Sequence, residues 1–228
     1  MKTFVAWLQE NNQEKKKIFV LIGPPSVGKS TWIKNTFAEE PYIINRDNIV
    51  ENIAKQMGLT YDDMFAAPSP NANIGDVNPR YGTVIQSPSY MNWQPLSYDN
   101  ILKANTTIGN ILKERINQAT QQHRDIVVDM TNMSAKSRQN ALNAIKGKES
   151  EYEKIAVIFP FHGSEDIIKR INKKRAEEIK AQGGSKTIPD VAFDRMFSTF
   201  EDVTAEEGFD QVIRQDNREM LRKLALGE

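Results

Sequence analysis

Residues 18–31 read IFVLIGPPSVGKST, and this stretch decides the fold of the chain. Its first five residues are large and apolar, which is typical of a buried strand, and residues 31–39 are compatible with a helix. The turn between them has the spacing G-x-x-x-x-G-K-S, which in this context is typical of a loop that binds nucleotide phosphates. A tight turn without a ligand is the alternative, and the spacing favours a nucleoside triphosphate site.

The residues of this loop have separate roles in such a site. Gly23 and Gly28 permit backbone conformations closed to other residues, so that amide hydrogens converge on phosphate oxygens at a helix N-terminus. Lys29 supplies a positive charge to the outer phosphates, and the Ser30 hydroxyl can ligate the accompanying magnesium. The predicted binding loop consists of Gly23, Pro24, Pro25, Ser26, Val27, Gly28, Lys29, Ser30 and Thr31.

Composition limits the classes of protein to consider. The 228 residues, 39% of them hydrophobic, fit one α/β domain better than two independent domains. The 30 basic and 30 acidic side chains balance, so a site for a polyanion must be a local patch. The absence of cysteine excludes disulfides and thiolate metal sites and suits a cytoplasmic location. No apolar run approaches the roughly twenty residues of a membrane span, and no signal peptide precedes the first strand.

Charged residues follow two further predicted strands. Residues 41–47, PYIINRD, end in Arg46 and Asp47, and residues 125–129, DIVVD, end in Asp129. Ligands of an open parallel sheet lie beyond the carboxyl ends of its strands, so these side chains are expected near the phosphate loop. Asp129 is predicted to hold magnesium-bound water or to orient the loop, with a cap on the next turn as the alternative. The plainer alternative for Asp47 is a helix N-cap.

Three more polar residues are expected near this rim of the sheet. Thr131 and Asn132 continue directly from the third strand, and Arg138 belongs to a helix predicted over residues 134–145. The two histidines, His123 and His162, lie far apart in the sequence and belong to no cluster with metal-ligand spacing, so both are predicted to be structural.

A helix predicted over residues 164–182 carries an arginine on its apolar face. Arg175 shares one column with Ile168, Ile171 and Ile179, where a leucine would be expected. An arginine on an inward face needs an anionic partner, which is either a structural carboxylate or a phosphoryl group in transfer. Arg175 is therefore a candidate catalytic residue.

The same helix is expected to belong to a lid over residues 164–186. The sequence QGGS at residues 182–185 permits a hinge at its end. Arg170, on the flank of the helix, is a weaker candidate for a contact with the donor nucleotide.

Residues 59–97 interrupt the pattern of helices and strands. Prolines, asparagines and serines break regular structure here, and aromatic residues are interleaved with them. The composition suits stacking on bases or sugars of an acceptor, and a surface loop pinned by its aromatics is an equal alternative. The remaining predicted elements are helices over 3–13, 97–122 and 217–226, a helix with Pro189 in its first turn, and strands over 155–161 and 209–213. The helix over 217–226 is either an oligomer contact or a packed tail.

Several motifs, in order along about two thirds of the chain, resemble the polynucleotide 5′-hydroxyl kinase family. This family includes phage polynucleotide kinases and the kinase domain of animal polynucleotide kinase/phosphatase. No phosphatase motif is found. The matching motifs are GPPSVGKSTW, INRD, DMTN, the N-x-x-R of residues 172–175, TIPDVAFDRM and FEDVTAEEGFDQVI.

The resemblance implies a single P-loop kinase domain over residues 1–228, with a mostly parallel sheet of four to five strands, flanking helices and a helical lid. It implies transfer of the γ-phosphate of ATP, with Mg²⁺, to a 5′-hydroxyl of DNA or RNA. A phage-encoded enzyme would act in the host cytoplasm. Asp47 matches the general base, Lys29 and Ser30 match the P-loop lysine and magnesium ligand, and Arg175 matches the lid arginine. The predicted acceptor-binding residues are Arg46, Asp47, Thr131, Asn132 and Arg138, and the predicted metal ligands are Ser30 and Asp129.

The chain departs from the family on the acceptor side. Val50 stands where family members usually carry an arginine that grips the 3′-phosphate of the acceptor, and the segment 59–97 is longer than expected. Two alternatives therefore stay open. One is a kinase of the same fold that acts on another hydroxyl, such as a hydroxymethylated pyrimidine in phage DNA, a tRNA or a small metabolite. The other is a nucleotide-binding switch without kinase activity.

Overall fold

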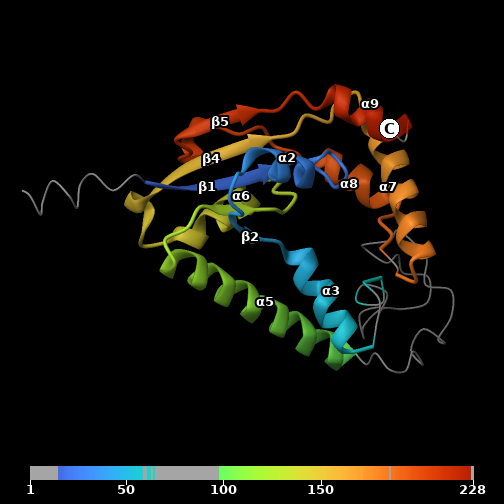
Figure 1. Ribbon diagram of the computed structural model, residues 1–228, viewed down its shortest axis with the longest axis horizontal. Helices are drawn as coiled ribbons and strands as arrows, with labels where there is room; N and C mark the ends of the chain where they lie inside the picture. The colour runs from blue at the N-terminus through green and yellow to red at the C-terminus, as the bar shows by residue number, and fades with distance from the viewer. Residues whose placement is uncertain (1–14, 59–60, 63, 65–97, 185, 227–228) are drawn as a thin grey trace, which may run out of the picture.

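The computed structural model describes residues 15–58, 61–62, 64, 98–184 and 186–226, and it is built on a five-stranded parallel sheet (Figure 1). The strand order is β2-β3-β1-β4-β5, so the strand before the phosphate loop lies at the centre. The predicted class, a mostly parallel sheet flanked by helices, is confirmed. The strands are β1 (Lys16–Ile22), β2 (Tyr42–Ile44), β3 (Ile126–Val128), β4 (Tyr152–Ile158) and β5 (Gln211–Arg214).

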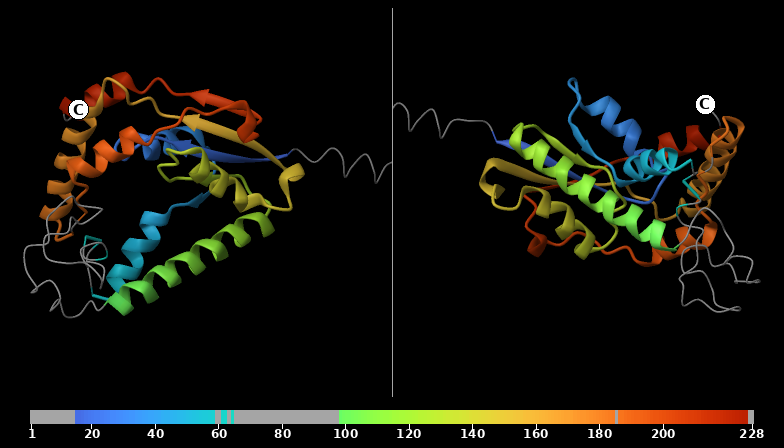
Figure 2. Two further views of the ribbon diagram at one scale, coloured as in Figure 1. Left: turned by 180° about the vertical axis from the view of Figure 1, so that it is seen from behind. Right: turned by 90° about the horizontal axis from the view of Figure 1, so that it is seen from below.

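Helices cover both faces of the sheet (Figure 2). The central strand is buried on both sides, as expected for a parallel sheet with helical crossovers. The helices are α2 (Lys29–Thr36), α3 (Arg46–Gln56), α5 (Tyr98–Gln121), α6 (Ala135–Leu142), α7 (Glu165–Ala181), α8 (Asp190–Ser198) and α9 (Arg218–Leu226). Short 3₁₀ turns are η2 (Asn143–Ile145), η3 (Glu149–Glu151) and η4 (Ala205–Glu207).

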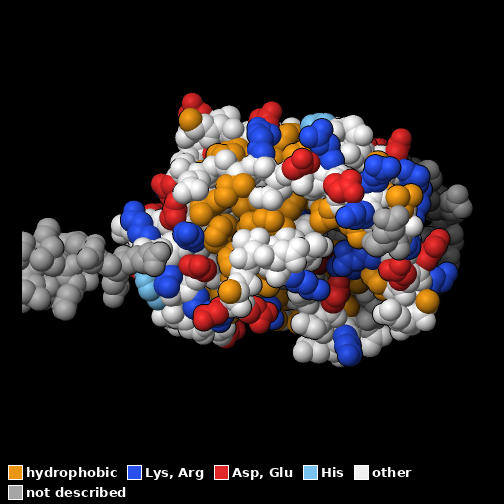
Figure 3. Space-filling model, turned by 45° about the horizontal axis from the view of Figure 1, so that its top comes forward, with side chains coloured by type: hydrophobic (Ala, Val, Ile, Leu, Met, Phe, Trp, Pro, Cys, Tyr) orange, Lys and Arg blue, Asp and Glu red, His pale blue; other side chains and the backbone are white. Residues whose placement is uncertain are grey.

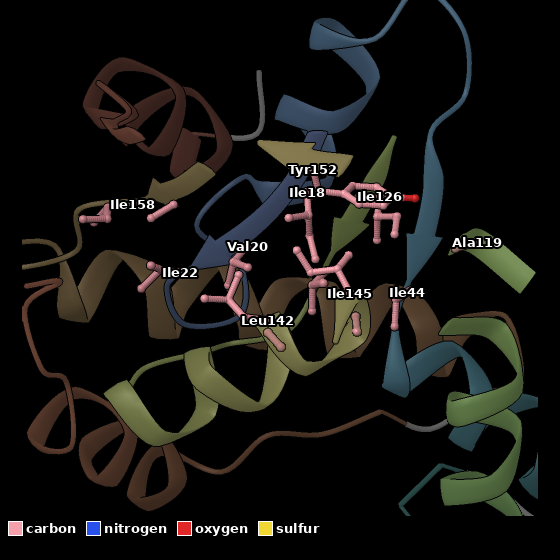
Figure 4. Close-up of a cluster of buried hydrophobic side chains, with 14 residues drawn as sticks. Ile18, Val20, Ile22, Ile44, Ala119, Ile126, Leu142, Ile145, Tyr152 and Ile158 are labelled. Carbon is pink, nitrogen blue, oxygen red and sulfur yellow. The ribbon is translucent and has the colours of Figure 1, made fainter. Parts of the chain in front are cut away.

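The side chains of β1 alternate between two hydrophobic clusters. Ile18, Val20 and Ile22 pack on one face with residues of α6 and η2, among them Leu142 and Ile145 (Figure 4). The alternate residues Phe19 and Leu21 pack on the other face with side chains from α2, α7, α8 and α9. A strand with period-two alternation and two buried faces is thus fixed in register, and the loop that follows it is fixed in position.

A third cluster joins α3 to α5. Ile49, Val50 and Ile53 of α3 are buried against Ala104 and Ile108 of α5. Figure 1 shows the two helices converging away from the sheet, toward the same end of the molecule at which α7 lies. This packing fixes the first turn of α3, which carries Arg46 and Asp47.

The start of α3 differs from the prediction. Strand β2 ends at Ile44 because Asn45 is the N-cap of α3, and its side chain accepts a hydrogen bond from the Asn48 backbone N–H at 3.1 Å. Asp47 therefore lies inside the first helical turn, and the alternative that it serves as the N-cap is excluded. A first-turn carboxylate remains favourable there because of the helix dipole.

Other boundaries shift by a few residues. Strand β4 begins three residues before the predicted start, because it pairs with β1 along its full length from Tyr152 opposite Lys16. Pro189 is the N-cap of α8 and not part of its first turn. The predicted helix over 3–13 and all but three residues of the segment 59–97 lie outside the described residues. No helix among the described residues is long and apolar enough to cross a membrane.

The last helix packs over the phosphate loop. Asn217 Nδ2, just before α9, donates hydrogen bonds to the carbonyls of Val27 at 3.2 Å and Pro160 at 3.1 Å. Leu221 is buried, and Met220 lies beside Gly28. Of the two alternatives for this helix, these contacts favour the packed tail.

Candidate functional site

A cavity of about 980 Å³ opens at the carboxyl ends of β1, β2 and β3. Its walls come from the phosphate loop and α2, the start of α3, the segment after β3, and α7 with the residues that follow it. Figure 3 shows Lys and Arg side chains gathered over the α7 end of the molecule. The predicted site residues that line the cavity are Pro25, Ser26, Gly28, Lys29, Ser30, Thr31, Arg46, Asp47, Asp129, Thr131 and Arg175.

The phosphate loop has the backbone that its glycines permit. Gly28 has φ +94° and caps α2 without a side-chain hydrogen bond, so the first amides of the helix keep their donors for a ligand. A Cβ at Gly28 would lie 1.8 Å from Met220 Cε. At Gly23 a Cβ would lie 3.1 Å from Phe159 Cβ, and the Gly23 N–H donates to the Thr131 carbonyl at 2.9 Å. The positive φ therefore favours glycine at position 28, where the flexible Met220 side chain could move aside, and the φ of +153° and the close Phe159 contact favour glycine at position 23.

Lys29 is folded back onto its own loop. Its Nζ donates hydrogen bonds to the carbonyls of Gly23 at 2.9 Å and Pro24 at 2.7 Å. Burial lowers the pKa of Lys29 from 10.5 to about 8, although the nearby carboxylates of Asp129 and Asp47 act to raise it. A bound phosphate would offer this buried cation the anionic partner that the loop carbonyls do not supply.

Asp129 and Asp47, two of the carboxylates that line the cavity, are each held by a neighbour. Asp129 Oδ2 accepts a hydrogen bond from Asn45 Nδ2 at 2.8 Å, so the end of β3 is tied to the cap of α3. Asp47 Oδ1 accepts a hydrogen bond from the Tyr61 hydroxyl at 3.2 Å, and Asp47 Oδ2 lies 3.7 Å from Lys186 Nζ. The side chain of Asp47 is 45% exposed, so a substrate hydroxyl can reach its carboxylate.

Arg175 lines the cavity from α7, together with Ile171 and Ile179. Its side chain is exposed, and no carboxylate of the described residues forms an ion pair with it. Because Arg175 is exposed, it does not require the structural carboxylate expected for a buried arginine, and the described residues supply none. Arg170 is also exposed but does not line the cavity, so its predicted contact with the nucleotide has no support here.

Two predicted acceptor-binding residues are buried structural groups. Asn132 is 3% exposed and donates from Nδ2 to the Leu21 carbonyl at 2.8 Å. Arg138 is fully buried, and its guanidinium donates to both carboxylate oxygens of Glu207, at 2.6 and 2.7 Å. Because their polar atoms are enclosed and partnered, neither residue can contact an acceptor, and these two predictions are wrong.

Three residues of the loop contribute through the backbone only. Gly23, Pro24 and Val27 are buried, and none of them lines the cavity. The two histidines lie outside the cavity, and each has its Nδ1 3.6 Å from a glutamate, His123 from Glu151 and His162 from Glu165.

Several residues that position the site were not predicted from the sequence. Asn45 ties Asp129 to α3, and Asn172, which is 5% exposed, donates from Nδ2 to the Ile188 carbonyl at 3.0 Å. Lys186 reaches Asp47 from the residues after α7. The N-x-x-R spacing was the only sequence signal for Asn172, and nothing local marks Lys186.

The donor set of the cavity fits magnesium with a nucleotide. Ser30 presents an exposed hydroxyl, and Asp129 presents a carboxylate, which are oxygen ligands that Mg²⁺ prefers. The described residues contain no group of three or more His, Cys, Asp or Glu that could hold a metal ion alone. Phosphate and water oxygens would therefore have to complete the coordination shell.

A parallel sheet whose central strand leads through G-x-x-x-x-G-K-S into a helix defines a P-loop α/β domain, the class that binds nucleotide phosphates. A family model described as AAA domain matches residues 18–203, and the chain belongs to this family.

Comparison with known proteins adds two solved structures of similar fold. A fungal RNA kinase is 14% identical with a TM-score of 0.42, and the match covers 94% of this chain and 83% of that one. A chain of the Pnkp1/Rnl/Hen1 RNA repair complex is 16% identical with a TM-score of 0.43, and the match covers 84% of this chain and 46% of that one. No curated protein matches the sequence significantly.

Proposed function

We propose that this protein is a kinase that transfers the γ-phosphate of ATP to a 5′-hydroxyl of DNA or RNA. The observation that carries the proposal is that Lys29, Asp47 and Arg175 line one cavity although they come from three separate elements. A cation at the phosphate loop, an accessible carboxylate and a guanidinium are the groups that in-line phosphoryl transfer requires. The motifs that resemble the polynucleotide 5′-hydroxyl kinase family support the choice of acceptor.

In this proposal, ATP supplies the phosphoryl group, and Mg²⁺ held by Ser30 and Asp129 would neutralise part of the phosphate charge. Lys29 and the first amides of α2 bind the donor phosphates. Asp47 accepts the proton of the acceptor hydroxyl. Arg175 orients the outer phosphate from α7, and its planar group of five donors suits three phosphoryl oxygens.

A kinase that acts on another hydroxyl is the second candidate, and Val50 favours it. This residue is fully buried in the cluster between α3 and α5, so position 50 cannot contact a 3′-phosphate. The cations that line the acceptor side of the cavity are Arg46 and Lys186. A hydroxymethylated pyrimidine in DNA, a tRNA or a small metabolite would need no contact at position 50.

The decisive experiment offers radiolabelled ATP together with different acceptors. These are 5′-hydroxyl DNA and RNA oligonucleotides, hydroxymethylated DNA with blocked ends, tRNA and nucleosides. We expect label at the 5′ end of an oligonucleotide. Label only on an internal base would replace the end-kinase proposal by the second candidate, and no transfer to any acceptor would favour a nucleotide-binding switch.

The variant Asp47→Ala tests the proposed base. We expect turnover to fall by about two orders of magnitude or more, because general base catalysis contributes that much. Asp202→Ala is the matched control, since this carboxylate is 71% exposed and does not line the cavity. Equal turnover of Asp47→Ala and the wild type would exclude Asp47 as the base.

A further inference from the structure

Lys186 is a nearly enclosed cation at the acceptor side of the cavity. It lies between α7 and α8, and its side chain is only 18% exposed. Its Nζ lies 3.7 Å from Asp47 Oδ2, forms a short ion pair with Glu51 and lies 4.8 Å from the centre of the Tyr61 ring. A lysine held on three sides in this way has little freedom to swing into solvent.

The backbone around Lys186 is held from two directions. The Thr187 N–H donates to both carboxylate oxygens of Asp62, at 2.8 and 3.1 Å. The Ile188 carbonyl accepts the hydrogen bond of Asn172, a buried residue of α7. The residues that follow α7 therefore meet the α3 side of the cavity through fixed contacts, and they carry Lys186 to Asp47.

The two carboxylate oxygens of Asp47 have different neighbours. Oδ1 accepts the Tyr61 hydroxyl, while Oδ2 faces Lys186 at a distance longer than a hydrogen bond. Glu51 takes the short contact with the same ammonium group. Lys186 thus attracts the Asp47 carboxylate without forming a hydrogen bond to it. Oδ2 therefore keeps a lone pair that can accept the proton of an incoming hydroxyl.

We infer that Lys186 is a positioning residue for Asp47 and keeps the Asp47 carboxylate aimed into the cavity. The inference rests on the proposed kinase function. Glu51 balances the ammonium charge, so that Asp47, Glu51 and Lys186 together carry one negative charge. Lys186 acts through Asp47 and needs no contact with the donor nucleotide.

Steady-state kinetics of Lys186→Met test the inference. We expect kcat to fall about ten- to a hundredfold, as for a misplaced catalytic group, and KM for ATP to stay within about twofold. Lys186→Arg should restore most of kcat, because it keeps the charge. Lys173→Met is the matched control, since Lys173 of α7 forms an exposed ion pair with Asp190 of α8 and lies outside the cavity.

A double-mutant cycle separates this role from a general structural effect. In the Asp47→Asn background, Lys186→Met should change the residual rate less than about twofold, because the group that it positions is already inactive. If Lys186→Met unfolds, Lys186→Gln keeps a polar group and takes its place, with melting curves to verify folding.

Three results would overturn the inference while wild-type transfer is intact. They are an unchanged kcat in Lys186→Met, a raised KM for ATP with unchanged kcat, and an equal loss in both backgrounds of the cycle. Absence of transfer by the wild type would instead refute the proposed function, and this inference with it.

Discussion

Replacing Arg138 by methionine should destabilise the protein strongly. The guanidinium is fully buried and donates two hydrogen bonds to Glu207. It also donates to backbone carbonyls, including that of Glu201 at 2.9 Å and that of Asp202 at 3.2 Å. Methionine fills much of the volume but removes the cationic partner of Glu207, which keeps only the hydrogen bond from the Thr204 N–H, and removes the donors to these carbonyls.

The expected magnitude follows from these contacts. Removing one partner of a buried ion pair costs about 3–5 kcal/mol of unfolding free energy. For a chain of this size each kcal/mol corresponds to about 2–4 °C, so we expect the melting temperature to fall by roughly 6–20 °C. Arg214→Met is the matched control, because its ion pair with Asp202 is exposed and should be worth less than about 1 kcal/mol.

The stability that the Arg138–Glu207 ion pair contributes depends on pH, and the pKa of Glu207 gives the direction of this dependence. The hydrogen bonds from Arg138 lower the pKa of Glu207 below its ordinary value. The ion pair therefore contributes its full stability above the ordinary carboxyl pKa and loses it as pH falls through the folded-state value. We expect the wild type and Arg138→Met to differ most at neutral pH and to converge in acid.

Thermal melts followed by circular dichroism, at neutral pH and at steps of pH below the ordinary carboxyl pKa, measure both quantities. The reasoning would be refuted by a melting temperature within about 2 °C of the wild type at neutral pH. If that result came with a raised KM for the acceptor, Arg138 would return to the role of an acceptor-binding residue.

Two further predictions concern the cavity. Asn45→Ala removes the cap of α3 and the hydrogen bond to Asp129. We expect the free energy of unfolding, measured in urea, to fall by about 1 kcal/mol, and the Mg²⁺ concentration needed in kinase assays to rise. Unchanged values of both quantities would contradict the two roles of Asn45. The pKa of Lys29, lowered to about 8 by burial, means that the unliganded protein loses this cation as pH rises. ATP binding measured by calorimetry should weaken about tenfold from about pH 7 to about pH 9, and Lys29→Met should lack this dependence; a flat profile in the wild type would count against the charge of Lys29.

The sequence alone predicted the phosphate loop and the class of fold. Strand, glycine turn and helix are adjacent in the chain, so the motif spacing alone predicts the position of Gly28 and Lys29 in the loop. The topology of a parallel sheet also placed Asp47 and Asp129 at one rim, because the carboxyl ends of parallel strands meet there. The alternative role of Asp47 as the cap of α3 lay two residues from the actual cap, Asn45, since asparagine and aspartate are almost equally good N-caps.

Only the tertiary structure decided which polar residues are free to act. Arg138 looked like an acceptor contact until η4, about seventy residues later, brought Glu207 against it. Nothing in the sequence around Lys186 indicates its partner, and only the folded chain brings it to the first turn of α3. A charge on a predicted helix or loop has no assigned partner in the sequence, because burial and pairing depend on segments that fold together from distant parts of the chain.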